Sequence, residues 1–419
     1  MRATSRRAYL IRSSGRATWG TPLLCHMFLV MALLSSLAVR TSPTVERSAP
    51  VSSRCPGPER ARIVGRLHTC GGVIVDHHNR LIRLKGFTLW HMARDPGLVG
   101  APGCWDWTMP PIDRFADVAR WGFNSIQLEV SWANIEAQPP TVDASGHVVH
   151  HWNHEYLRAL DQVIDAAKRH GLAVLLTMTQ IRWSSAFRNL KLRHGHVQAC
   201  GYGMPPWLYP KGGGLHAMVK AERRFFANRN RIQKGFVAVW RKLARRYRHE
   251  SPVVGAFILH EAYDLLSGGY PGTSDLSPAS LHLARFYEKV GDAIHRVNRH
   301  LLVMYSDHSD WRTGQFALTR KPHLSKAVYG VEFYARNWNP DGKTTLARYE
   351  RRAKVWNKPL WIHEFNAFHI PYSNDAYPHW ARSTRHLLEH ARRHHLSWHY
   401  NCSPDLPSGR ILRVLRSGL

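Results

Sequence analysis

Eight short apolar segments alternate with amphipathic segments between residues 81 and 400, and this alternation constrains the fold more than any other feature. The apolar segments are rich in β-branched and aromatic residues, a pattern typical of buried strands. They are Leu81–Trp90, Ser125–Val130, Ala173–Met178, Val253–Leu259, Leu301–Tyr305, Ala327–Tyr334, Leu360–Ile362 and Leu396–Tyr400. Eight strands separated by helices predict an α/β protein with a parallel (β/α)8 TIM barrel.

Apolar residues at helical spacing predict the helices between these strands. They are Pro111–Trp121, Glu155–His170, Phe225–Arg248, Ala279–Asn298, Thr345–Asn357 and Tyr377–His395. The connection from Thr179 to about Ala221 is rich in Gly and Pro, which argues against regular structure there, and connections of this length are usually binding loops. A doubly wound open sheet also fits the alternation, although no Gly-rich nucleotide-binding loop follows any strand.

The N-terminus has the composition of a targeting segment. Five arginines between Arg2 and Arg16 precede an apolar run at 23–34, and Ser36-Leu37-Ala38 fits a small-x-small cleavage signal. We expect residues 1–38 to be a signal peptide or, as the alternative, a signal anchor, although the run is short for a membrane span. The predicted location is secreted or periplasmic.

The remaining chain divides by composition. Residues 39–61 are rich in Ser, Pro and charge and predict a linker, and 404–419 form a basic C-terminal tail. The barrel domain spans 62–403. It begins with a short N-terminal β-hairpin, because Gly71-Gly72 separates the apolar pairs around Ile63 and Val73–Val75.

The formal net charge of +29 is extreme and favours a polyanionic partner if taken alone. Much of it lies in the two termini and on amphipathic helices, so we expect a solvated basic surface and no nucleic acid partner. Of six cysteines, Cys25 lies in the predicted signal and the other five permit two disulfides of open connectivity. No cysteine spacing fits a zinc site, and the pairs His77-His78 and His394-His395 are expected to be surface residues.

Two strand ends carry a glutamate in matching contexts. ILHEAY places Glu261 after the fourth strand and LWIHEFN places Glu364 after the seventh. Strand C-terminal ends face the active site of such barrels, and a buried carboxylate is costly unless it is paired or used. Two carboxyl groups about 5 to 5.5 Å apart are the retaining glycosidase arrangement. Each Glu could instead pair with one of the many arginines.

The sequence resembles family 5 glycoside hydrolases of the cellulase type over roughly Ile82 to Ser403. The matching segments are RLKGFTLW, ARWGFNSIQLEVSWANIE, DQVIDAAKRHGLAVLLTM, VWRKLARRYRHESPVVGAFILHEAY and KPLWIHEFNAF. The resemblance implies that Glu261 is the general acid/base and Glu364 the nucleophile. It also implies a hydrolase that needs no metal or organic cofactor, and we expect none.

The chain departs from the family pattern at several substrate-binding positions. His260 stands where the family has the Asn that holds the sugar 2-hydroxyl, and Gln127 stands where it has an Arg. The His-x-Tyr of strand six matches Glu332-Phe333-Tyr334. A His-Glu pair on strand four resembles the family 26 mannanases of the same clan. The expected His after strand three has no counterpart near Thr179 and Gln180.

Aromatic residues fall where sugar subsites are expected. Trp90, Trp132 and Trp398 lie at or just beyond strand ends and are candidate substrate-binding rings, although Trp is also often buried in cores. Asn401 can equally occupy the family position that we give to Trp398.

The sequence therefore predicts an exported, monomeric retaining glycosidase that acts on an oligo- or polysaccharide, a β-glucan or β-mannan. The alternative is a catalytically impaired barrel that binds glycans or anionic cell-wall polymers.

Overall fold

The computed structural model describes residues 55–63, 65–93, 106–191, 197–262, 276–307, 316–333, 346–366, 380–401 and 406–419. All of them belong to one compact unit, Ser53–Leu419. The predicted signal segment 1–38 and the candidate residue Tyr334 lie outside the described residues. No helix in the described ranges combines the length and apolar composition that a bilayer span requires.

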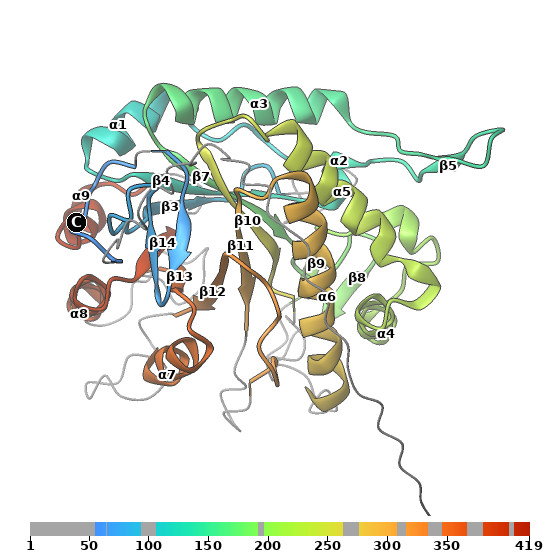
Figure 1. The fold of residues 1–419 in the computed structure, drawn as a ribbon. Helices are drawn as coiled ribbons and strands as arrows, with labels where there is room; N and C mark the ends of the chain where they lie inside the picture. Colours follow the sequence, from blue (N-terminus) through green and yellow to red (C-terminus); the bar gives the residue numbers. More distant parts are fainter. Residues whose placement is uncertain are drawn as a thin grey trace, which may run out of the picture. The chain divides into compact units, whose positions relative to one another are not determined.

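Eight parallel strands close into a barrel (Figure 1). In chain order they are β3 (Lys85–Leu89), β4 (Ser125–Val130), β7 (Ala173–Thr179), β10 (Val253–His260), β11 (Leu302–Ser306), β12 (Ala327–Glu332), β13 (Leu360–Phe365) and β14 (Ser397–Asn401). Each strand pairs with the next, and β14 pairs with β3 through Trp398 beside Lys85. The closure confirms the predicted (β/α)8 barrel, because a doubly wound sheet leaves its two end strands unpaired.

Helices surround the barrel (Figure 1). They include α1 (Phe115–Arg120) after the short helix η2 (Ile112–Arg114), α3 (His154–Arg169), α5 (Gln233–Arg246), α6 (Leu276–Val297), α7 (Leu346–Trp356) and α8 (Trp380–Arg393). Helix α3 shows why these segments are helical. The Asn153 side chain accepts a hydrogen bond from Tyr156 N and caps the helix, while Leu157, Leu160 and Ile164 bury one face.

The prediction of one helix at Phe225–Arg248 is wrong. Helix α4 (Leu215–Phe226) ends there, the short helix η4 (Arg229–Arg231) follows, and α5 then begins. Asn228 and Asn230 have positive φ values of 51° and 54°. Asparagine tolerates this left-handed conformation better than most residues, so these two asparagines break the helix.

The connections also hold regular structure that the sequence did not predict. The short helix α2 (Trp132–Ile135) follows β4, and η3 (Pro206–Leu208) lies in the long connection. Two small antiparallel hairpins are β5 (Thr141–Val142) with β6 (Val148–Val149) and β8 (Arg188–Lys191) with β9 (Val197–Cys200).

The segment that we expected as a basic tail contains a helix, α9 (Gly409–Arg416). Apolar residues recur at helical spacing in RILRVLR, and Val414 and Leu415 are buried. Gly418 approaches the Leu388 side chain of α8. The basic C-terminus thus packs on the barrel through one apolar face.

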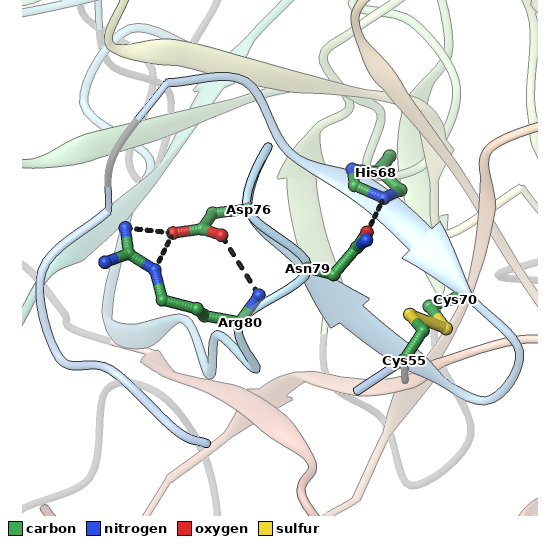
Figure 2. The surroundings of a disulfide bond; sticks show 6 residues. All are labelled: Cys55, His68, Cys70, Asp76, Asn79 and Arg80. Carbon is green, nitrogen blue, oxygen red and sulfur yellow. Dashed lines mark hydrogen bonds and ion pairs between the residues drawn. A yellow bond between two sulfur atoms is a disulfide. The ribbon is translucent and has the colours of Figure 1, made fainter. Parts of the chain in front are cut away.

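A hairpin of β1 (His68–Cys70) and β2 (Val73–Val75) precedes the barrel, as predicted, although its first strand starts later than Ile63. Figure 2 shows the disulfide Cys55–Cys70 and the buried Asp76 carboxylate that accepts from Arg80. Leu67 and Ile74 belong to the same apolar cluster as barrel residues including Leu84, Phe257 and Trp361. The hairpin therefore packs against the apolar interior of the barrel.

One glycine controls the pairing of β3 with β4. A Cβ atom on Gly86 would lie 1.7 Å from the backbone oxygen of Ser125, which cannot move without breaking the strand pair. We expect Gly86→Ala to lower the free energy of unfolding by about 3 kcal/mol or more, as severe overpacking does, or to prevent folding.

Gly72 provides the matched control because a Cβ atom there meets no atom within 4 Å. Chemical denaturation followed by circular dichroism measures both variants. Equal stabilities of Gly86→Ala and Gly72→Ala would contradict the close approach of the two strands.

Candidate active site

The two predicted catalytic glutamates lie at the same end of the barrel. Glu364 is on β13 and is 4% exposed, and Glu261 directly follows β10 and is half-buried. Because all eight barrel strands are parallel, their carboxyl ends meet at one rim. The topology therefore places both side chains on the face where such barrels carry their chemistry.

His260, the last residue of β10, is the hub of this rim. Its imidazole is buried, and its Nε2 lies 3.0 Å from Glu364 Oε2 and 3.2 Å from Glu332 Oε1. Its Nδ1 lies 3.1 Å from Glu129 Oε1 and 3.3 Å from Thr179 Oγ1. One ring thus contacts three carboxylates that come from three other strands.

These contacts determine the charge of the imidazole. Burial by itself lowers the pKa of His260, but attraction to Glu129 and hydrogen bonds to Glu129, Glu332 and Glu364 outweigh it and raise the pKa well above 6.5. His260 is therefore an imidazolium at neutral pH. Both of its N–H groups donate, and Nε2 shares its proton between two carboxylates.

The carboxylate of Glu364 is held on both oxygens. His260 donates to Oε2, and Asn401 Nδ2 at the end of β14 donates to Oε1 across 2.9 Å. Glu332 is the strand partner of Glu364 in the pairing of β12 with β13. The two acids are therefore neighbours on adjacent strands, and both contact the same imidazolium.

Glu261 adopts an unusual backbone conformation, with a φ of 52°. The side-chain amide of Gln180 donates to the Glu261 carbonyl oxygen, and its own oxygen accepts from Trp183 N at 2.7 Å. Left-handed φ values are rare for glutamate and often occur at functional sites. Gln180 thus ties the residue after β10 to the segment after β7.

The Glu261 carboxylate lies beside the same imidazole. Donor atoms of His260, Glu261 and Glu332 all lie within 4.8 Å of one another. Since Glu364 contacts His260 as well, both candidate catalytic carboxylates border one ring.

Sequence reasoning did not assign a role to Glu129, Thr179 or Gln180. Glu129 is 4% exposed on β4, and a carboxylate inside the apolar strand SIQLEV is a signal that it has a buried partner. The sequence does not identify this partner, because His260 lies 131 residues after Glu129 in the chain. For Thr179 and Gln180 the sequence offered only their position after a strand.

The other candidate binding residues have different surroundings. Gln127 is fully buried on β4, two residues before Glu129 and on the same face of the strand. Glu129, which is nearer the carboxyl end of the strand, is the residue that contacts His260. Trp132 is buried against Trp207 and Phe236, and its Nε1 donates to Glu136.

Trp398 is buried between Phe123 and Phe365. The rings of Trp132 and Trp398 are therefore packing elements, and we do not include them or Gln127 in the proposed site. Trp90 directly follows β3 and is 7% exposed at the carboxyl end of the barrel, which leaves it as a candidate.

Histidine and carboxylate atoms at this rim are close enough to suggest a metal site by distance alone. The donor atoms of His260, His363 and Glu364 lie within 4.8 Å of one another. A metal ligand must be a neutral imidazole, whereas the pKa of His260 is raised by its carboxylate partners. The charge state of His260 thus fits an ion pair better than a metal ligand.

Comparisons with known proteins support the interpretation of the fold. Solved structures that resemble the chain include an endogalactoceramidase (TM-score 0.64, 18% identity, 84% of this chain and 85% of that chain covered). Another is endo-glycoceramidase II from Rhodococcus sp. as a lactosyl-enzyme intermediate (TM-score 0.56, 18% identity, 84% and 81% covered). A hyperthermostable endocellulase has a TM-score of 0.51 at 14% identity, with 84% and 98% covered.

No curated protein matches the sequence. The family model described as cellulase (glycosyl hydrolase family 5) matches residues 75–403, which include the whole barrel. The chain therefore belongs to glycosyl hydrolase family 5, a family of glycosidases.

Proposed function

We propose that this protein is an exported retaining glycoside hydrolase that cleaves a β-linked glycan of the β-glucan or β-mannan type. The observation that carries the proposal is that Glu261 and Glu364, at the ends of the fourth and seventh barrel strands, border one buried imidazole. Paired carboxylates on one rim are what double displacement requires.

In the first step Glu364 attacks the anomeric carbon while Glu261 gives its proton to the leaving oxygen. This step forms a glycosyl ester on Glu364 and releases the aglycone. Glu261, now ionised, takes a proton from water, and the water attacks the same carbon and breaks the ester. Two inversions leave the configuration of the sugar unchanged.

His260 orients the nucleophile in this scheme. Its imidazolium donates to Glu364 Oε2, and the Asn401 amide donates to Oε1, so the carboxylate has one orientation before substrate arrives. When Glu364 loses its charge in the ester, the imidazolium still has Glu129 and Glu332 as partners. The histidine can therefore remain charged through both steps.

The fold neighbours bear on the substrate class. Their names refer to ceramide glycolipids and to cellulose, and a complex with ganglioside GM3 is among them. This range of names agrees with a glycosidase for β-linked glycans.

The proposed export has two supports. The arginine-rich N-terminus, the apolar run 23–34 and Ser36-Leu37-Ala38 have the order of a signal peptide. The disulfide Cys55–Cys70 lies shortly after this segment, and disulfides persist mainly in oxidising compartments.

The first test concerns the two carboxylates. We expect Glu261→Gln and Glu364→Gln each to lower kcat/KM on β-linked glycosides by about 10²-fold to 10⁴-fold or more, because each removes a proton donor or a nucleophile. A panel of aryl β-glycosides and β-glucan and β-mannan oligosaccharides identifies the substrate. A 2-deoxy-2-fluoro glycoside of the best sugar should label Glu364, as located by peptide mass spectrometry.

Glu222→Gln is the control, since Glu222 lies on α4, outside the strand ends, and is 4% exposed, as Glu364 is. A label on another residue would overturn the assigned roles. If the wild type cleaves nothing in the panel, and Glu364→Gln still binds polysaccharide as the wild type does, the chain is a non-hydrolytic glycan-binding barrel.

The second test concerns the charge of His260. Because its pKa is raised, the imidazolium is present at and below neutral pH and is lost as pH rises through the raised value. Glu129→Gln removes the largest attraction, so burial lowers the pKa of His260 against only the hydrogen bonds to Glu332 and Glu364. We expect the alkaline limb of the kcat/KM profile to move to lower pH.

Glu136→Gln is the matched control because Glu136 is also a buried partner of a histidine, His150, at 2.5 Å. It should leave the alkaline limb in place even if it lowers stability. An unchanged limb in Glu129→Gln would show that His260 does not govern the activity.

The third test concerns processing. Expression of the full chain in a host with an active export pathway should yield protein whose N-terminus begins shortly after Ala38, as measured by intact mass and N-terminal sequencing. Replacing four residues of the apolar run 23–34 by charged residues should retain the protein inside the cell. Recovery of an intact N-terminus in the membrane fraction would instead indicate an uncleaved anchor.

A further inference from the structure

Two imidazoles and one carboxylate form a cluster on the outer helices, away from the strand ends. Glu350 lies on α7, His390 lies on α8, and His394 directly follows α8. Glu350 Oε1 is 2.7 Å from His390 Nε2 and 3.5 Å from His394 Nδ1. One donor atom from each residue lies within 4.8 Å of the other two.

The spacing of these atoms matches a zinc coordination sphere. Zinc binds imidazole nitrogen and carboxylate oxygen at about 2.0 to 2.2 Å, which places tetrahedral ligands about 3.3 Å apart. The observed distances of 2.7 and 3.5 Å lie on either side of that value. The two imidazole nitrogens lie within 4.8 Å of each other, so binding an ion needs the three side chains to move by at most about 1.5 Å.

The helices hold the ligands in place. His390 and His394 are four residues apart, so they project from the same face, and their rings are stacked with centroids 4.1 Å apart. Leu387 and Ala391 of α8 and Tyr349 of α7 are buried in the core next to these positions. Glu350 and His390 lie on helices, which keep ligand geometry better than loops, and His394 is held in the turn that ends α8 by its backbone N–H, which donates to the His390 carbonyl oxygen.

The local charge also permits a cation, although the helix is basic. Arg392 and Arg393 flank the cluster, and both pair with Glu389, at 2.9 and 3.5 Å respectively. The single Glu389 carboxylate offsets one of these two positive charges next to the site. The Glu350 carboxylate faces the two imidazoles, where it can supply the negative charge that a divalent ion needs.

We propose that Glu350, His390 and His394 bind a divalent transition-metal ion of the zinc type, with water completing the coordination. Two imidazole ligands favour zinc over magnesium or calcium, which prefer oxygen ligands alone. The ion joins α7 to α8 on the outside of the barrel. Because it binds only when the two helices are packed together, it stabilises the folded state.

The test uses tag-free, chelator-treated protein titrated with Zn²⁺ by calorimetry. We expect the wild type to bind one more equivalent than the His390→Ala/His394→Ala double variant. Glu350→Gln, which keeps the side-chain volume, should weaken this equivalent at least tenfold. At a Zn²⁺ concentration about 100-fold above Kd, the wild-type Tm should rise by about 3 °C and that of the double variant should not.

His386→Ala is the matched control, because this exposed histidine lies one turn earlier on α8 and outside the group of close donor atoms. It should bind Zn²⁺ as the wild type does. Equal stoichiometry and equal Tm rise in the wild type and the double variant would overturn the proposal. A loss in His386→Ala as large as in His394→Ala would overturn the assigned ligand set.

The strand-end site also contains histidine and carboxylates, so the total amount of bound Zn²⁺ is not the criterion. The criterion is the difference in bound Zn²⁺ between the wild type and each variant. His394 is half-exposed, so His394→Ala alone provides a variant whose folding is little affected. Circular dichroism of each variant without metal checks that the variant is folded. The loss of one bound equivalent of Zn²⁺ then reflects the missing ligands and not unfolding. This inference does not depend on the proposed glycosidase activity.

Discussion

The buried imidazolium of His260 is the interaction on which the arrangement of the catalytic rim depends. Its contacts join β10 to β4 through Glu129 on one side and to β12 and β13 through Glu332 and Glu364 on the other. In the closed barrel β4 and β13 are not neighbours, so one ring connects strands across the barrel mouth. Removing one partner of a buried ion pair typically costs about 3 to 5 kcal/mol, which gives this network strong control over side-chain positions.

The same network explains how the site tolerates a departure from its family. A neutral Asn in place of His260 would have no charge to offset Glu129 or Glu332. The imidazolium therefore depends on Glu129 and Glu332 for its charge, and these two acids depend on the imidazolium as their buried partner. The backbone of Glu261 next to it has a positive φ and is held by Gln180, which directly follows β7. The acid/base candidate is therefore positioned through its backbone, whereas the nucleophile candidate Glu364 is positioned through its side chain.

The sequence predicted the barrel well because each strand carries a local signal. Eight apolar segments with helical segments between them specify both the strand count and the order, and these place Glu261 and Glu364 on one rim. Contacts across the barrel carry no such signal, which is why Glu129 was not recognised as the partner of His260. Aromatic residues were misleading for a related reason. Trp132 opens the short helix after β4, and Trp398 is the second residue of β14, near the end of the strand opposite the site. Both rings are buried in the core, where they cannot contact a ligand.

Helix boundaries were the least predictable part, since two asparagines in left-handed conformations ended a helix whose apolar pattern continued on both sides of the break.

The protein has a net positive charge, whereas most charged side chains around His260 are carboxylates. These two sets of charges also act over different distances. The chain carries a formal net charge of +29, yet the described residues around His260 include the carboxylates Glu129, Glu261, Glu332 and Glu364. At physiological ionic strength, exposed charges are screened beyond about 8 Å, whereas buried groups in contact are not. Surface arginines therefore have little influence on the reaction centre. Their field instead acts on the surroundings of the protein, and under the proposed function the shape and hydrogen bonds of the site would select an uncharged glycan.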